Sequence, residues 1–474
     1  MTFIPKGPIS RRELIRRTGQ LGMMGAAAPL ALQLNGLANA AAAGATDYKA
    51  LVCIFLYGGN DFGNTVIPVD LANYDKYHAI RGGSDGRQAG GIAYGHDEIL
   101  PMALKPVAQQ TLTDDIQYAL NPNLKGMKSL FDHGHAAIQL NVGPLITPLT
   151  LAQYNNPNKT AYPLPPKLFS HNDQQSVWQS LGSEGSTVGW GGRLGDMVLD
   201  GNDESLLTCI SASGNAVFVS GNDALQYQIS PDGAIAIGAI NNPAVPESIR
   251  DAMKYLITRP SDHMLENEFA KVTQRSIRME GIVNGALNRV QMNTPFDTSP
   301  GDNELADQMK IIARLIGARK AFGAKRQVFF ASLGGFDNHD LLMENHPALL
   351  AKIDEAMSSF YAATVELGVA DQVTAFTASD FGRAFGRNAD GSDHGWGGHH
   401  FVVGGAVKGG QYYGTAPHVS LETEDQVGQG RLLPSTGVDQ FAATLARWFG
   451  ASASDLPDIF PNIGNFSDTD LKFI

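Results

Sequence analysis

The sequence has very little cysteine and, after residue 40, no long apolar run. Only Cys53 and Cys209 occur in 474 residues, which excludes a disulfide framework. Both lie in apolar stretches, so we interpret them as small buried hydrophobic residues; a single disulfide between them is the alternative. A membrane-spanning helix needs about eighteen or more apolar residues in succession, and no stretch after residue 40 approaches this length. No membrane span is therefore predicted beyond the N-terminus.

Basic residues are also too few for a nucleic-acid-binding protein. The formal net charge of the whole chain is -12. The first forty residues have a net charge of +4, which leaves -16 for the rest, because they contain Glu13 and the basic residues Lys6, Arg11, Arg12, Arg16 and Arg17. A surface this acidic repels nucleic acid and anionic lipid, so neither is expected as a partner.

The N-terminal segment has the features of a twin-arginine export signal. Arg11-Arg12 precedes a weakly apolar, alanine-rich run from residue 21 to residue 37, and Ala38-Asn39-Ala40 matches a cleavage site. A membrane anchor is the alternative, but Gln33 and Asn35 make the run too polar. We therefore expect residues 1–45 to be a signal and linker, and the mature protein to be periplasmic or secreted.

The rest of the chain, residues 46–474, shows no internal repeat and is predicted to be one α/β domain with long loops and a helical insertion around residues 245–322. Its 53 glycines cluster where polar groups follow apolar strands. Helices are expected at 124–131, 302–322 and 347–367, and strands at 51–57, 136–142, 327–333, 373–378 and 401–403. The helix at 347–367 separates two strands, which makes them parallel. The expected fold is a large, mostly parallel central sheet with helices on both faces.

Three predicted strands end in a polar loop that contains an aspartate: Asp61, Asp337 and Asp380. The carboxyl ends of parallel strands share one edge of a sheet, so these carboxylates should converge. His339 and His394 lie in the same loops, and a divalent cation would relieve the repulsion between the carboxylates. Mixed aspartate and histidine ligation favours zinc, manganese or a similar ion, with calcium as an alternative.

A second set of residues suggests an anion or nucleophile site. Ser170 precedes a predicted helix through Trp178, and the N–H groups at a helix start favour an anion; capping of that helix is the structural alternative. Arg193, Arg383 and Arg387 are able to hold a phosphate or sulfate group, although each is also a suitable surface ion-pair partner. Trp396, among glycines, is expected to pack the loop.

Six motifs resemble those of the DUF1501 family of exported bacterial proteins: GGND (58–61), SHNDQQ (170–175), GWGGR (189–193), GGFDNH (334–339), SDFGR (379–383) and DHGWGG (393–398). That family is in turn similar to the alkaline phosphatase and sulfatase superfamily. The resemblance implies an alkaline phosphatase-like sheet, metal ligands at Asp61, Asp337, His339, Asp380 and His394, and Ser170 as nucleophile with Thr65 as second choice. Phe381 departs from the pattern, because the superfamily has a metal-binding histidine after this aspartate.

Two hypotheses about function follow. The first is a metal-dependent hydrolase of phosphate or sulfate esters, acting on a small-molecule or polymer ester, with Ser170, Arg193 and Arg383 as catalytic residues. The second is a catalytically degenerate member of the superfamily that acts as an exported binding or assembly protein. The residue that favours the second hypothesis is Phe381.

Overall fold

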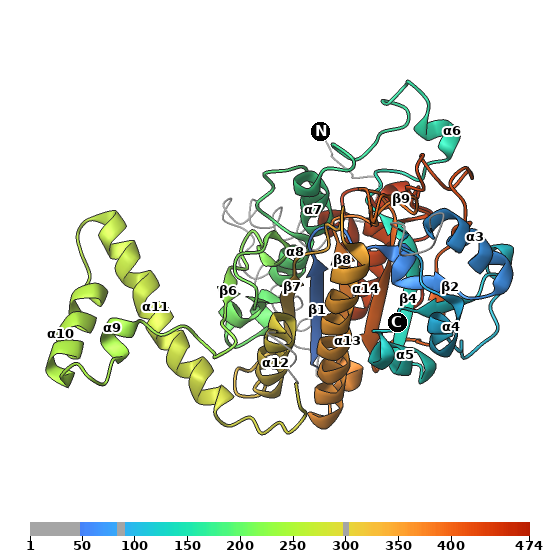
Figure 1. Ribbon diagram of the computed structural model, residues 1–474. Helices are drawn as coiled ribbons and strands as arrows, with labels where there is room; N and C mark the ends of the chain where they lie inside the picture. Colours follow the sequence, from blue (N-terminus) through green and yellow to red (C-terminus); the bar gives the residue numbers. More distant parts are fainter. Residues whose placement is uncertain (1–47, 83–90, 297–302) are drawn as a thin grey trace, which may run out of the picture.

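A computed structural model describes residues 48–82, 91–296 and 303–474 of the chain. The predicted export signal and linker lie outside these residues. Within them, the central element is a nine-stranded sheet of order β12-β4-β11-β8-β1-β7-β5-β6, with β13 also paired to β4 (Figure 1). Its strands are β1 (Lys49–Leu56), β4 (Ala136–Gly143), β5 (Cys209–Ser211), β6 (Gln226–Gln228), β7 (Arg326–Leu333), β8 (Val373–Ser379), β11 (Gly398–Gly404), β12 (Tyr412–Tyr413) and β13 (Thr436–Gly437).

The sheet is parallel except at β11, and this exception keeps one loop at the functional edge. Strand β1 pairs in parallel with both β7 and β8, so the parallel relation predicted for these two strands is confirmed, with β1 lying between them. Strand β11 is antiparallel to β8 and to β4. The loop from Asp380 to Gly397 therefore leaves β8 and enters β11 at the same edge of the sheet, where the other parallel strands end.

The sheet buries both of its faces. Alternate residues of β1 belong to two different cores: Val52 and Ile54 lie in one, and Cys53 and Phe55 in the other. This alternation follows from the two-residue period of a strand. Because both faces are covered, the strands are continuously apolar, which is why the sequence pattern located them.

Helices cover the two faces. The first core contains residues of α5 (Lys125–Asp132), α12 (Glu304–Gly317) and α13 (Leu342–Glu366), and the second contains residues of α7 (His171–Ser180), α8 (Trp190–Val198), α14 (Val438–Phe449) and α15 (Leu456–Ile459). The predicted α/β fold is thus confirmed; the finer likeness to alkaline phosphatase stays a prediction. None of the described helices is both long and apolar enough to cross a membrane.

Smaller elements complete the body. Residues 71–115, which the sequence suggests to be a surface excursion, include α3 (Leu71–Arg81), whose last residue, Arg81, is buried in the interior. The other short elements are α4 (His96–Ile99), α6 (Leu151–Tyr154), the antiparallel pair of β2 (Val66–Pro68) with β3 (Tyr118–Leu120), and the hairpin of β9 (Arg387–Asn388) with β10 (Gly391–Ser392).

The predicted helical insertion divides into two parts with different surroundings. Helix α12 packs in the core, together with the C-terminal part of α11 (Met264–Leu287). In contrast, α9 (Gly238–Asn241), α10 (Glu247–Thr258) and the N-terminal part of α11 project from the body as an arm (Figure 1). The base of the arm is fixed by Asn284, whose Oδ1 accepts a hydrogen bond of 2.9 Å from the Ala234 N–H. No residue of α10 is buried.

Candidate metal centre

Glycines allow three strand-end loops to approach one another closely. A Cβ atom on Gly58, which has φ +114°, would lie 2.4 Å from the Asp337 backbone nitrogen. A Cβ on Gly382 would lie 2.0 Å from the Gly397 carbonyl oxygen. Only glycine permits these approaches. The glycines that follow β1 and β8 therefore position the side chains of the neighbouring loops.

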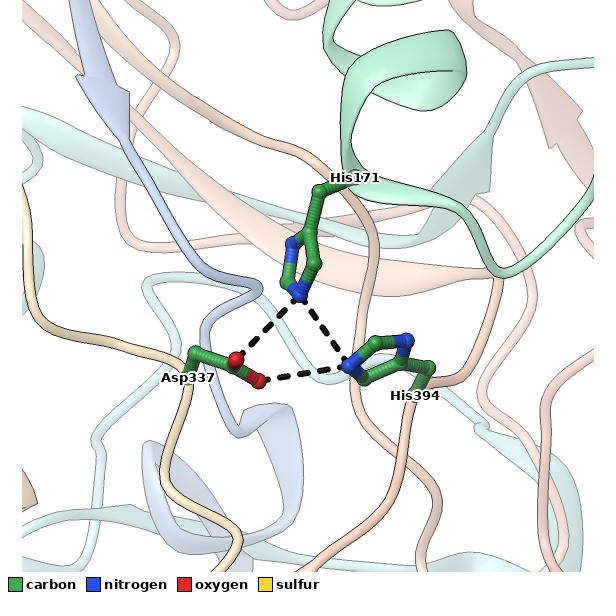
Figure 2. A group of neighbouring side chains, drawn as sticks. All are labelled: His171, Asp337 and His394. Carbon is green, nitrogen blue, oxygen red and sulfur yellow. Dashed lines mark hydrogen bonds and ion pairs between the residues drawn. The ribbon is translucent and has the colours of Figure 1, made fainter.

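Three side chains from different elements point toward one another at this edge: His171, Asp337 and His394 (Figure 2). The His171 Nε2 atom lies 3.0 Å from His394 Nε2 and 3.3 Å from Asp337 Oδ2. The His394 Nε2 atom lies 3.3 Å from Asp337 Oδ1. Ligand atoms about 2.0–2.1 Å from a tetrahedral zinc ion are roughly 3.3 Å apart, so these separations fit one small cation.

The hydrogen bonds on the far side of each imidazole determine which nitrogen faces the centre of the group. His171 Nδ1 lies 2.7 Å from Asp380 Oδ2, and His394 Nδ1 lies 2.7 Å from the Phe169 carbonyl oxygen. Both oxygens can only accept, so both Nδ1 atoms carry hydrogen. In the neutral imidazoles, each Nε2 then presents a lone pair to the other and to the Asp337 carboxylate. Three acceptors at this distance require a proton or a cation between them.

The charges of the group suit a cation. Burial opposes ionisation of Asp337, but the hydrogen bond and charge of Arg383 hold the pKa of this carboxyl below its usual value. Burial lowers the pKa of His394, which keeps its Nε2 available as a ligand. The hydrogen bond to Asp380 raises the pKa of His171. Asp337 is 45% exposed, so solvent reaches the group.

His339 extends the group on one side. Its Nε2 atom lies 2.9 Å from His394 Nε2 and 3.0 Å from Asp337 Oδ1. His339 is not a member of the group formed by His171, Asp337 and His394. His339 is therefore placed either to add a further ligand or to exchange a proton with a water molecule beside Asp337.

Phe381, which follows Asp380 in the chain, covers the two central imidazoles. Its ring centroid lies 5.0 Å from that of His171 and 4.8 Å from that of His394. Gly59 leaves room for this ring, because a Cβ there would lie 2.4 Å from the Phe381 Cε2 atom. Phe381 thus restricts the rotation of two of the candidate ligands.

The structure brings together three of the five predicted ligands: Asp337, His339 and His394. Asp61 is buried and paired with Arg81, and its Oδ2 accepts a hydrogen bond of 3.3 Å from Ser392 Oγ. Although burial opposes its charge, the Arg81 guanidinium lowers the pKa of Asp61. Its position corrects the expected convergence, because this carboxylate already has its counter-ion.

Asp380 supports a candidate ligand instead of joining the group. Its Oδ2 interacts with His171 Nδ1 and accepts a hydrogen bond of 2.8 Å from Gln175 Nε2. His171 and Gln175 are four residues apart on α7, so they lie on the same face of this helix. His171 belongs to the SHNDQQ motif (170–175), in which Ser170 and not His171 was the predicted site residue. The four-residue spacing of His171 and Gln175 was the signal in the sequence that could have pointed to His171.

The predicted catalytic residues have structural partners. Ser170 Oγ donates to Asp173 Oδ2 at 2.9 Å, within its own helix start. Arg193 Nη1 donates to the carbonyl oxygens of Ser180 and Ile459, at 3.1 and 2.9 Å. These contacts do not place either residue at the group of three. The prediction of Ser170 as nucleophile and of Arg193 as oxyanion ligand has no support in this geometry.

Arg383 is at the site, but in a positioning role. The buried guanidinium donates from Nη1 to Asp337 Oδ1 at 2.6 Å and to the Gly58 carbonyl oxygen at 3.1 Å, and from Nε to Ser392 Oγ at 3.0 Å. These bonds connect the loops after β1, β7 and β8. Because its donors are engaged, Arg383 orients Asp337 and is not placed to hold a substrate anion.

Three further residues near the start of β11, Trp396, His399 and His400, belong to the core. His399 and His400 are buried, and burial lowers the pKa of each to about 3. His399 Nδ1 accepts a hydrogen bond from the Asn141 N–H at 3.1 Å. Trp396 is buried and donates to the Pro144 carbonyl oxygen at 2.8 Å, which confirms its predicted packing role.

Comparison with known proteins identifies a family and two distant structures. The model of a family described as "Protein of unknown function (DUF1501)" matches residues 48–454. No curated protein sequence matches the chain. Two crystal structures of Ps i-CgsB, the first in complex with k-i-k-neocarrahexaose, are 9% identical to it, with TM-scores of 0.36 and 0.34. The alignments cover 89% and 88% of this chain and 77% of each of those chains, and they carry no argument about function.

Proposed function

Because the chain belongs to the DUF1501 family, whose description assigns no activity, we propose its function from the geometry: a metal-dependent hydrolase with one divalent cation held by His171, Asp337 and His394. The observation that carries this proposal is the convergence of three acceptor atoms whose orientations are fixed by Asp380, Arg383 and the Phe169 carbonyl oxygen. Zinc or manganese suits this mixed nitrogen and oxygen set better than calcium.

The chemistry implied is hydrolysis by an activated water molecule. A divalent cation in such a site lowers the pKa of a bound water to about 7, which provides a nucleophile without a serine. Three protein ligands leave one position of a tetrahedron for that water. His339, beside Asp337, is placed to accept the proton of the water. Ser170 has no role in this scheme.

The substrate class we propose is an ester, with phosphate and sulfate esters tested first. The predicted anion ligands Arg193 and Arg383 are engaged with backbone oxygens and with Asp337, so substrate binding depends on the cation and not on an arginine pair. A cation held by His171, Asp337 and His394 would stabilise the negative charge that develops on a substrate oxygen.

The experiment is a metal and activity measurement on paired variants. Exported wild-type protein should contain close to one zinc or manganese ion per chain and hydrolyse at least one generic phosphate, sulfate or carboxylate ester. His171→Ala should lose both properties. His133→Ala, in which an exposed histidine on the far side of the sheet is removed, should keep both. A wild-type protein that binds no divalent cation under saturating conditions would contradict the proposal.

A second candidate function, an exported binding protein with a structural cation, is favoured by one observation. Every predicted catalytic side chain has a partner within the fold: Ser170 with Asp173, Arg193 with two carbonyl oxygens, and Arg383 with Asp337. This candidate predicts stoichiometric metal without hydrolysis of any ester in the panel. It also predicts that removal of the metal lowers the melting temperature.

A further inference from the structure

Helix α11 exposes an apolar stripe on the projecting arm. Leu265, Phe269 and Val272 are 68%, 63% and 48% exposed. Their spacing of four and three residues places them on one face of the helix, and Ser276 continues the same face one turn further. Exposed large apolar side chains at this spacing are typical of a surface that packs against another helix.

The exposed apolar surface of the arm is large for a monomer. Ile249, Tyr255, Leu256 and Met264 are each at least half exposed, in addition to the three residues of the stripe. An exposed aromatic side chain presents roughly 150–250 Å², so the seven side chains together present several hundred Å². The largest apolar patches of typical monomers reach only about 300–600 Å². The exposed apolar area of the arm is therefore comparable with the largest patches of monomers, which are often functional.

The charge of the arm distinguishes between partners. Residues 247–287 contain six acidic and six basic residues and are formally neutral, whereas the whole chain has a net charge of -12. The acidic excess therefore lies outside the arm. An arm that projects from an acidic body allows the neutral helices of two copies to meet while the two bodies stay apart (Figure 1).

The order of charges along α11 matches a second copy of the same helix in the antiparallel direction. Glu268 and Arg275 are seven residues apart, so they lie on the same flank of the stripe. In an antiparallel pair related by a two-fold axis, residues on one flank meet the same flank of the partner. Phe269 of one chain then packs on Val272 of the other, and Glu268 meets Arg275 twice, once in each half of the pair.

From these observations we infer that the protein forms a homodimer through antiparallel packing of α11 against α11 of a second copy. The apolar stripe supplies the buried contact, and the Glu268–Arg275 pairs fix the direction. Within one chain, Glu268 Oε2 also lies 3.8 Å from Lys271 Nζ, but both groups are well exposed and such a pair contributes little. The inference does not depend on the proposed metal site.

The test is a charge exchange measured by sedimentation velocity on the full mature chain. Glu268→Arg alone and Arg275→Glu alone each place like charges at both contacts, and each should raise the dimer dissociation constant about tenfold or more. When the two variants are mixed in equal amounts, both contacts become complementary again. The mixture should therefore form a heterodimer close to wild-type affinity.

Two charge changes on α10 serve as controls. Asp251→Arg and Lys254→Glu change the same kinds of charge on α10, away from the face that Ile249 and Leu256 share, and should leave the dimer unchanged. Phe269→Asp should abolish it, with an unchanged melting temperature of the body. A wild-type protein that stays monomeric at high micromolar concentration would overturn the inference. Single variants that dimerise as tightly as the wild type would also overturn it, and so would an equal mixture of the two variants that does not recover wild-type affinity. Binding of the monomer to neutral vesicles would overturn it as well, because the exposed apolar surface would then be assigned to a lipid surface.

Discussion

Asp61 and Asp337 occupy equivalent places at the ends of neighbouring strands, yet they have opposite surroundings. Asp61 is 1% exposed and faces the guanidinium of Arg81. Asp337 is 45% exposed, and it contacts Arg383 and the three histidines His171, His339 and His394. The first carboxylate is neutralised within the fold, and the second keeps an oxygen directed at two imidazole nitrogens. Both aspartates pair with an arginine, so the difference lies in their surroundings: only the exposed Asp337 also faces imidazole nitrogens and is available to a cation.

The strongest way to break this comparison is Arg81→Ala. It would leave Asp61 as a buried charge without its counter-ion, because Arg81 and Asp61 are both inaccessible to solvent. We expect a loss of about 3–5 kcal/mol in the free energy of unfolding, measured by chemical denaturation. The protein that remains folded should bind the same amount of metal as wild type. A loss of metal at full folding would mean that Asp61 belongs to the site after all.

Gly59→Ala tests the packing of the Phe381 ring against the loop that leads to Asp61. Gly59 has φ +85°, and an added methyl group would overlap the Phe381 ring. Strained backbone and overpacking together should cost about 2–4 kcal/mol in unfolding free energy. Because Phe381 covers His171 and His394, metal affinity should fall as well. Gly464→Ala is a suitable control, since a Cβ there has open space around it; an equal effect of both variants would contradict this account.

Asp380→Asn tests the support of the metal centre without touching a ligand of the proposed cation. The neutral amide no longer fixes the His171 Nδ1 hydrogen as firmly as a carboxylate does. Removal of such a supporting group typically lowers metal affinity 10–100-fold. Isothermal titration with zinc should show this loss, and the zinc stoichiometry should stay unchanged. An unchanged affinity would show that Asp380 does not orient His171 toward the cation.

Asp439 extends the comparison to a third aspartate, which is buried. This carboxyl group is hydrogen-bonded to Asn462 and, among the described residues, to no arginine. Burial raises its pKa to about 6, despite a hydrogen bond of 3.2 Å from the Asn462 N–H. The folded protein therefore holds the proton more tightly than the unfolded chain, and stability falls as the pH rises from about 4 to about 6. Asp439→Asn should remove this loss and add on the order of 2 kcal/mol at pH 7. Melting curves at pH 4 and pH 7 should show the difference growing with pH.

The sequence allowed the prediction of the sheet and of the edge that carries the site, because strands buried on both faces are continuously apolar. The bounds found for β4 and β7 differ from those predicted by one residue at one end. The partners of each strand-end side chain were not predictable in the same way. Arg81 comes from α3, in a stretch whose polar composition suggests a surface, and its burial depends on the position of Asp61 in space.

His171 could not be identified by its type alone. Whether Ser170 or His171 of the same motif faces the sheet edge depends on the angle at which α7 begins, and that angle follows from tertiary packing. The sequence shows that His171 and Gln175 share a helix face, but not that this face meets Asp380. Conversely, His399 and His400 follow His394 closely in the sequence, but they lie in β11 with their side chains in the core.

The central position of β1 has a consequence for how the protein is made. Its two neighbours are Arg326–Leu333 and Val373–Ser379, so one edge of β1 stays unpaired until synthesis has passed residue 333 and the other until it has passed residue 379. Contacts between parts so far apart in the chain form slowly, and open strand edges favour aggregation in the meantime. The core of the sheet is therefore completed only after most of the chain has been synthesised, and until then β1 has an open edge.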